Sequence, residues 1–141
     1  MVSDEVRLFF EEFERNSTAL NLDRIGAQFA DVFMNADPER AGPVPKAAFL
    51  AALPQREKMF SAIGVNRIRL SGVRETVLDP MHTLAATDWI AELKDGNELP
   101  LASTFILRRY GASFVVVFYL NHQDIRRLIA GRSGADPAHR Q

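Results

Sequence analysis

The sequence contains no cysteine, a single tryptophan and no long run of apolar residues. Without cysteine, disulfide bonds, thiolate zinc sites and cysteine nucleophiles are excluded, and we predict a cytoplasmic location. The longest unbroken apolar run covers residues 114–120, far short of the roughly 20 residues that a membrane-spanning helix needs. The acidic start, Met1 to Glu5, also lacks the basic segment of a secretion signal. We therefore expect no membrane partner.

An excess of charge of one sign is also missing, because 17 basic and 18 acidic residues give a formal net charge of −1. No global basic field is available to hold a phosphate backbone, so we expect no nucleic-acid partner. The sequence has no three-ligand metal spacing, no glycine-rich phosphate loop and no G-x-S-x-G motif, so we expect no metal or cofactor. With 141 residues, we predict one domain over residues 1–131 and a polar tail over 132–141.

The first half of the chain has the apolar spacing of helices. A helix is predicted from Ser3 to about Asn16, with phenylalanines at three- and four-residue steps. A second short helix begins after Asn21, residues 31–35 are expected to be extended, and residues 36–43 have the proline and glycine content of a loop. A third helix is predicted from Pro45, with a kink or restart at Pro54.

After Gly64 the apolar spacing becomes alternating, which is typical of strands. Four strands joined by short turns are predicted, over residues 66–78, 82–93, 101–109 and 113–121. The last of these is apolar on both faces, so we expect it to be central, with helices on one side and a partner subunit on the other. A short helix over residues 123–130 follows. The predicted fold class is α+β, with N-terminal helices packed into a strongly curved antiparallel sheet.

Residues 22–31, LDRIGAQFAD, followed by Asp37-Pro38, resemble a pattern of the nuclear transport factor 2-like superfamily. This superfamily includes the SnoaL-like proteins and ketosteroid isomerase. The resemblance implies a cone-shaped sheet around helices that encloses an apolar cavity. It implies no single activity, because the superfamily contains isomerases, dehydratases, cyclases, hydrolases and non-catalytic binding modules.

Asp37 is the candidate catalytic residue, because the resemblance places it where ketosteroid isomerase has its carboxylate base. A carboxylate beside an apolar cavity gains basicity, since burial disfavours its charged form. The alternative is that Asp37 only caps the turn that an Asp-Pro pair begins. The oxyanion donors of the isomerase are missing, because Phe13 stands at the position of the tyrosine and residues 102–105 contain no acid. His82 can serve as a proton shuttle or as an exposed turn residue.

The resemblance also suggests which side chains line a cavity, and core packing is the alternative for each. The candidate ligand-pocket residues are Phe13, Phe33, Asn35, Phe60, Trp89 and Thr104. Two functions remain open. The first is a pocket protein for a small apolar molecule, with isomerase or lyase chemistry based on Asp37. The second is a non-catalytic binding or dimerisation module, and both allow a homodimer through the convex face of the sheet.

Overall fold

The computed structural model describes residues 2–132. In this range the elements are α1 (Asp4–Thr18), α2 (Leu22–Ala27), β1 (Phe29–Ala36), β2 (Ala41–Pro45), α3 (Lys46–Ala62), β3 (Val65–Val77), β4 (His82–Leu93), β5 (Glu98–Tyr110), β6 (Ser113–Asn121) and α4 (Ile125–Arg132). The strands form one sheet in the order β2-β1-β6-β5-β4-β3. The predicted tail lies, apart from Arg132, outside the described residues.

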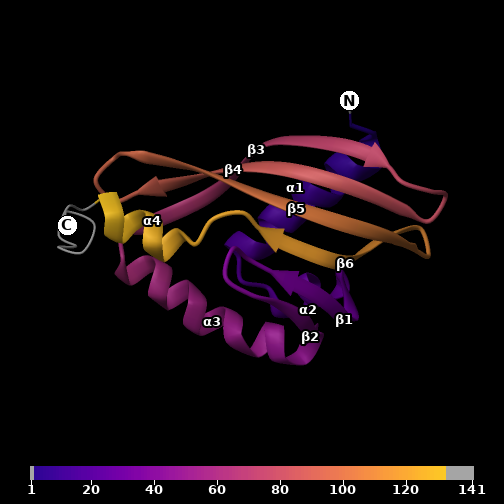
Figure 1. The fold of residues 1–141 in the computed structure, drawn as a ribbon, viewed down its shortest axis with the longest axis horizontal. Helices are drawn as coiled ribbons and strands as arrows, with labels where there is room; N and C mark the ends of the chain where they lie inside the picture. Colours follow the sequence, from indigo (N-terminus) through magenta and orange to yellow (C-terminus); the bar gives the residue numbers. More distant parts are fainter. Residues whose placement is uncertain (1, 133–141) are drawn as a thin grey trace.

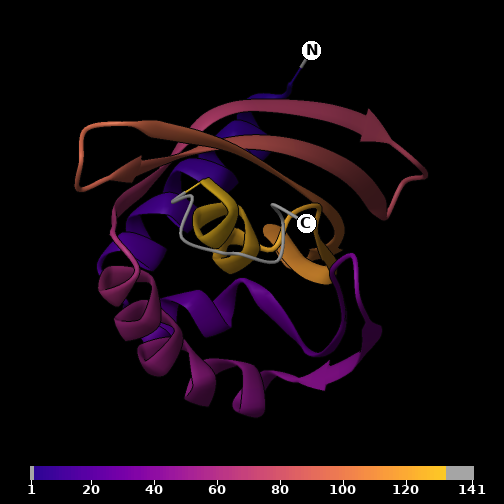
Figure 2. The same ribbon diagram turned by 60° about the vertical axis from the view of Figure 1, so that its left-hand side comes forward.

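The α+β fold class is confirmed, because the helices pack into a sheet that curls strongly around α1 (Figures 1 and 2). The sheet is mixed rather than wholly antiparallel, since β1 pairs with β6 in the parallel direction. The other neighbouring strands pair antiparallel. The order of apolar and polar residues along β6 does not indicate whether a strand distant in the sequence, such as β1, pairs with it parallel or antiparallel. The prediction of an antiparallel sheet is therefore corrected at this one pairing.

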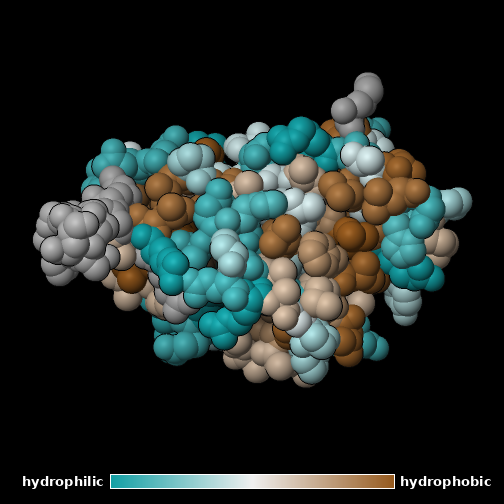
Figure 3. Space-filling model, in the orientation of Figure 1, coloured by the Kyte–Doolittle hydropathy of each residue, from teal (hydrophilic) through white to brown (hydrophobic). Residues whose placement is uncertain are grey.

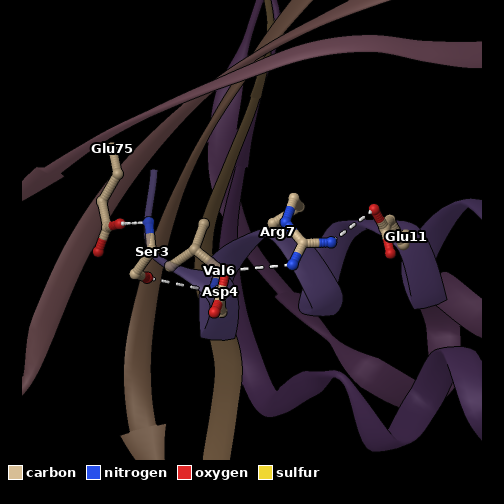
Figure 4. A network of polar contacts seen from close by, with 6 residues as sticks. All are labelled: Ser3, Asp4, Val6, Arg7, Glu11 and Glu75. Carbon is tan, nitrogen blue, oxygen red and sulfur yellow. Dashed lines mark hydrogen bonds and ion pairs between the residues drawn. The ribbon is translucent and has the colours of Figure 1, made fainter. Parts of the chain in front are cut away.

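Helix α1 begins where the sequence predicts, at a serine cap followed by acidic residues. The Val6 N–H donates to Ser3 Oγ at 3.3 Å, and the Ser3 N–H donates to Glu75 of β3 at 2.7 Å (Figure 4). Arg7 pairs at 3.1 Å with Asp4 and with Glu11 along the exposed side of the helix (Figure 4). The opposite side of α1 buries Val6 and three phenylalanines. The amphipathic spacing thus fixes α1 against the inner face of the sheet.

The segments around β2 and α3 differ from the prediction. Residues Ala41–Pro45, within and just after the predicted loop, form β2, and only Asp37 to Arg40 make the tight turn. Helix α3 continues through Pro54 and does not restart there. Proline at that position lacks the N–H that would bond to the preceding turn. Leu53 and Phe60, on either side of it, are both buried, and this packing maintains one helix.

The meander from β3 to β6 follows the prediction closely. Gly64, just before β3, and Gly96 and Gly111, in the β4–β5 and β5–β6 connections, all have positive φ. Along β4 every second residue is buried, from Thr83 to Leu93, so this strand has one inner and one outer face. The inner face packs on α1, and we call the convex side the outer face. Strand β6 is interior in the sheet, which confirms its predicted central place.

Both edges of the sheet carry groups that oppose the addition of further strands. At one edge, Pro43 and Pro45 of β2 have no N–H to offer a neighbour. At the other edge, the Leu70 N–H of β3 donates to a carboxylate oxygen of Glu14 at 2.8 Å. Helix α1 therefore binds part of the edge that β3 would otherwise expose.

Candidate functional site

The interior of the curled sheet is filled by aromatic side chains in contact with one another. Phe13 of α1 lies 5.3 Å from Phe105 and 6.0 Å from Trp89, measured between ring centroids. Phe105 stacks on Tyr119 at 4.7 Å with an angle of 13° between the ring planes. Phe29 of β1 closes the group, 6.0 Å from Phe13. These rings occupy the region where the resemblance implies an apolar cavity.

The structure divides five of the six predicted pocket residues among three places. Phe13, Phe33 and Trp89 belong to this aromatic core. Phe60 belongs to a second apolar cluster, beneath α4. Thr104 lies on the outer face, where its Oγ1 is 2.7 Å from His122 Nε2. Thr104 therefore does not share a wall with Trp89.

On β5 it is Ser103, the register partner of Thr87, that points to the interior, because neighbouring residues of a strand point to opposite faces. Thr87, Ser103 and Asn121 face one another across three strands. The Trp89 indole donates to Thr87 Oγ1 at 2.7 Å, and Thr87 donates to the Ser103 carbonyl at 2.8 Å. Ser103 Oγ donates to Asn121 Oδ1 at 2.8 Å. We call Thr87, Trp89, Ser103 and Asn121 the inner polar row.

Tyr119 of β6 and Asn35 of β1 are register partners. Tyr119 precedes Asn121 of the inner polar row by two residues. The Tyr119 side chain is buried, but its hydroxyl makes no hydrogen bond among the described residues. No fully buried side-chain oxygen or nitrogen in residues 2–132 lacks a partner. The hydroxyl must therefore reach solvent, at an end of the interior where Asn35 is half-buried. Sequence reasoning missed Tyr119 and Asn121, which look like ordinary residues of an apolar strand.

Asp37 lies in the exposed turn between β1 and β2. Its Oδ1 accepts hydrogen bonds from the N–H groups of Glu39 at 2.8 Å and Arg40 at 3.1 Å. This is the turn-capping role that the sequence offered as the alternative to a base. In the same turn, Glu39 forms an ion pair with Arg127 of α4. The role of Asp37 as a base stays a prediction.

Two surface hollows lie away from both Asp37 and the inner polar row, at the connection between β4 and β5. One of about 450 Å³ is lined by the end of β4, the start of β5, their connection and Asn66 of β3. The other, of about 190 Å³, lies between Ile63, Leu93 and Ile129. Among residues 2–132, no three acidic or histidine side chains come close enough to hold a metal ion. None of the helices in this range has the length and apolar content to cross a bilayer.

The ionisable groups with shifted pKa values lie on the surface of the molecule rather than in the interior. Hydrogen bonds from Arg109 hold the pKa of Glu5 below its ordinary value. The pKa of Asp79 is also lowered, first by the Met81 N–H and then by His82. His82 itself begins β4 on the outer face, with Nδ1 at 3.0 Å from Asp79. It lies neither beside Asp37 nor in the interior.

The outer face of the sheet has a charged half and an apolar half. Arg69 of β3 bridges Glu92 of β4 and Glu98 of β5, and Arg74 of β3 pairs with Asp88 of β4. Beyond these ion pairs lie half-buried or exposed apolar side chains from β1, β4, β5 and β6, which we call the outer apolar patch: Met34, Leu84, Ile106, Val115, Phe118 and Leu120. Figure 3 shows hydrophobic residues gathered over the centre and right of this view, where Figure 1 places these strands.

The fold is similar to that of several solved structures. A nuclear transport factor 2-like protein of unknown function from Shewanella oneidensis superposes with a TM-score of 0.70 and 11% identity, covering 87% of this chain and 100% of its own. A nuclear transport factor 2-like protein with a cystatin-like fold from Novosphingobium aromaticivorans gives 0.66 and 15%, covering 89% and 86%. A protein from the same species, named as a candidate scytalone dehydratase, gives 0.62 and 6%, covering 83% and 80%.

These similarities define the fold of the chain. The chain has the nuclear transport factor 2-like fold, as its resemblance to that superfamily implies. A scan against models of protein families finds no match. A search of curated proteins finds no similar sequence. At these identities the solved structures establish the fold alone.

Proposed function

We propose that this protein is a non-catalytic binding module that associates with a second copy of itself through the outer apolar patch. The observation that carries the proposal is the position of Phe118. It lies on β6, within the sheet, yet its side chain is on the outer face between Ile106 and Met34, opposite the face that α1 packs on in the described residues. A contiguous apolar surface of this kind marks an interaction site.

A second copy fits this surface better than other occupants. An apolar patch is complementary to itself, so two copies related by a two-fold axis cover each other's patch. The ion pairs of Arg69 and Arg74 are satisfied within the chain and form a polar border on one side. The formal net charge of −1 gives little repulsion between copies.

Sedimentation velocity at micromolar concentration tests this proposal. We expect the wild-type chain to sediment as a dimer and Phe118→Lys to sediment as a folded monomer. Asn97→Lys is the matched control, because it adds the same charge in the exposed connection between β4 and β5, away from the patch. Its dimer should persist. A monomeric wild type, or a Phe118→Lys protein that stays dimeric, would overturn the proposal.

A second candidate function is small-molecule binding at the inner face, with isomerase or lyase chemistry based on Asp37. The observation in its favour is the hydroxyl of Tyr119, which reaches solvent from an aromatic interior close to the inner polar row. Asn35 is its register partner, and Asp37 follows Asn35 by two residues. The similar structure named as a candidate scytalone dehydratase is compatible with this reading.

Thermal shift with small apolar hydroxy and keto compounds tests the second candidate. A bound ligand raises the melting temperature by mass action. We expect Tyr119→Phe to reduce the shift and Asp37→Asn to abolish turnover, while Thr104→Val, on the outer face, changes neither. If no compound shifts the melting temperature, ligand binding fails. If Asp37→Asn keeps full turnover, the base assignment fails.

A further inference from the structure

His82 is held between a carboxylate and a guanidinium at one end of the outer face. Its Nδ1 lies 3.0 Å from Asp79 Oδ1, and its Nε2 lies 3.0 Å from Arg108 Nη1. The ring is partly shielded, with about 28% of the side chain exposed. His82 and Arg108 are register partners on β4 and β5, so they form one row across the sheet.

These two contacts define how the ring is hydrogen-bonded. A guanidinium has only donors, so His82 Nε2 must accept the hydrogen bond from Arg108. In this arrangement the proton on Nδ1 is donated to Asp79. The N–H groups of Met81 and His82 donate to Asp79 at 2.8 and 2.7 Å, which fixes the carboxylate in place.

The charged groups that face His82 are few. Asp79 comes from the turn before β4, and Arg108 from β5. On the β3 side, the adjacent residues Val77 and Leu78 are uncharged. The nearby pair of Arg109 and Glu5 belongs to the inner side of the sheet, where Arg109 lies over the Phe114 ring. A proton added to His82 therefore changes mainly its interactions with Asp79 and Arg108.

The row formed by His82 and Arg108 borders the outer apolar patch. Leu84 is two residues after His82 on the same face, and Ile106 is two residues before Arg108. Val115 of β6 is the register partner of Arg108 and belongs to the patch. A change in charge at this row therefore changes the border of the surface that we propose to be the subunit interface.

We propose that His82 is a pH-sensitive contact at the border of this interface, and that its protonation weakens the association of two copies. The inference rests on the proposed function. A proton on Nε2 removes the acceptor for Arg108 and places two positive charges about 3 Å apart. Arg108 must then move away, and both subunits carry an added charge beside Leu84 and Ile106. Charges of one sign at an interface border oppose association.

The dissociation constant of the wild-type dimer, measured by sedimentation equilibrium between about pH 8 and about pH 5.5, tests this inference. We expect the constant to rise at least about tenfold as the pH falls. His82→Gln offers Arg108 an amide oxygen that does not titrate, so its dimer should lose most of this pH dependence. His122→Gln, which changes the histidine beside Thr104 on the same face, is the matched control and should keep it.

The outcomes separate the inference from the proposed function. A wild-type dimer whose dissociation constant is independent of pH overturns the inference and leaves the dimer intact. The inference is also overturned, with the dimer intact, if His82→Gln retains the full pH dependence or if His122→Gln abolishes it. A wild type that is monomeric at pH 8 overturns both. Side-chain ¹⁵N shifts at pH 8 give a separate check, because a proton on Nε2 of His82 would contradict the proposed tautomer.

Discussion

At the scale of single residues, the hydrogen bonds of the Asp37 side chain stabilise an exposed turn. Asp37 uses Oδ1 to accept from two consecutive backbone N–H groups, which holds the turn between β1 and β2. Such a bond contributes roughly 0.5–1.5 kcal/mol to stability. We expect Asp37→Ala to lower the free energy of unfolding by about 1 kcal/mol, measured by urea denaturation. Asp37→Asn keeps an acceptor oxygen and should cost less; equal losses for the two variants would contradict the capping role.

Thr87 is the most deeply buried member of the inner polar row, with 1% of its surface exposed. Thr87→Val leaves the Trp89 indole without its acceptor, and an unsatisfied buried donor costs about 1–3 kcal/mol. We expect a loss of that size in urea denaturation. Thr104→Val is the control, since its hydroxyl bonds to His122 on the exposed outer face. That change should alter stability by less than about 0.5 kcal/mol, and similar losses for both would exclude the inner polar row as the reason.

At the scale of elements, an ion pair joins the start of α1 to the end of β5. Arg109 donates to both carboxylate oxygens of Glu5, at 2.8 and 2.9 Å, and lowers the pKa of Glu5 from its ordinary value of 4.5. A lowered pKa adds stability that is present above 4.5 and is lost as pH falls through the folded-state value. The pair is exposed, so the effect is small and sensitive to salt.

We therefore expect the free energy of unfolding to fall less steeply with acid in Glu5→Gln and in Arg109→Gln than in the wild type. Urea denaturation between about pH 6 and about pH 3 measures this slope. The double variant should match Glu5→Gln, because each single change already removes the pair. A wild-type slope in Glu5→Gln would show that other carboxylates carry the acid sensitivity.

The elements most accurately predicted from the sequence are those with strong local signals. Alternation locates β4 at residues 82–93, and Lys94 to Asn97 make the predicted hairpin connection. The faces of β5 are harder to predict, because Phe105 and Ile106 are both apolar and only the fold shows that Phe105 lies inside. A register shift opposite Ile106 and Leu107 lets Phe118 face outward and Tyr119 inward. Alternation cannot locate such a bulge, so strict alternation along β6 does not place Tyr119 inside.

At the scale of the whole molecule, association and folding are linked if the outer apolar patch joins two copies. A partner that binds only the folded chain stabilises it by mass action, so the melting temperature rises with protein concentration. We expect such a rise for the wild type over a hundredfold concentration range, and a constant melting temperature for Phe118→Lys. Calorimetry or circular dichroism measures both. A wild-type melting temperature that is independent of concentration would count against the dimer.

Trp89 is the single tryptophan of this molecule, and its position determines what the tryptophan emission reports. The indole is 7% exposed and bound to Thr87, on the face of the sheet opposite the outer apolar patch. Its emission should be blue-shifted in the folded chain and move to longer wavelength when the interior opens. Separation of two folded copies leaves the surroundings of the indole unchanged. Tryptophan fluorescence should therefore report unfolding while remaining insensitive to dissociation, so the two processes can be resolved in one titration.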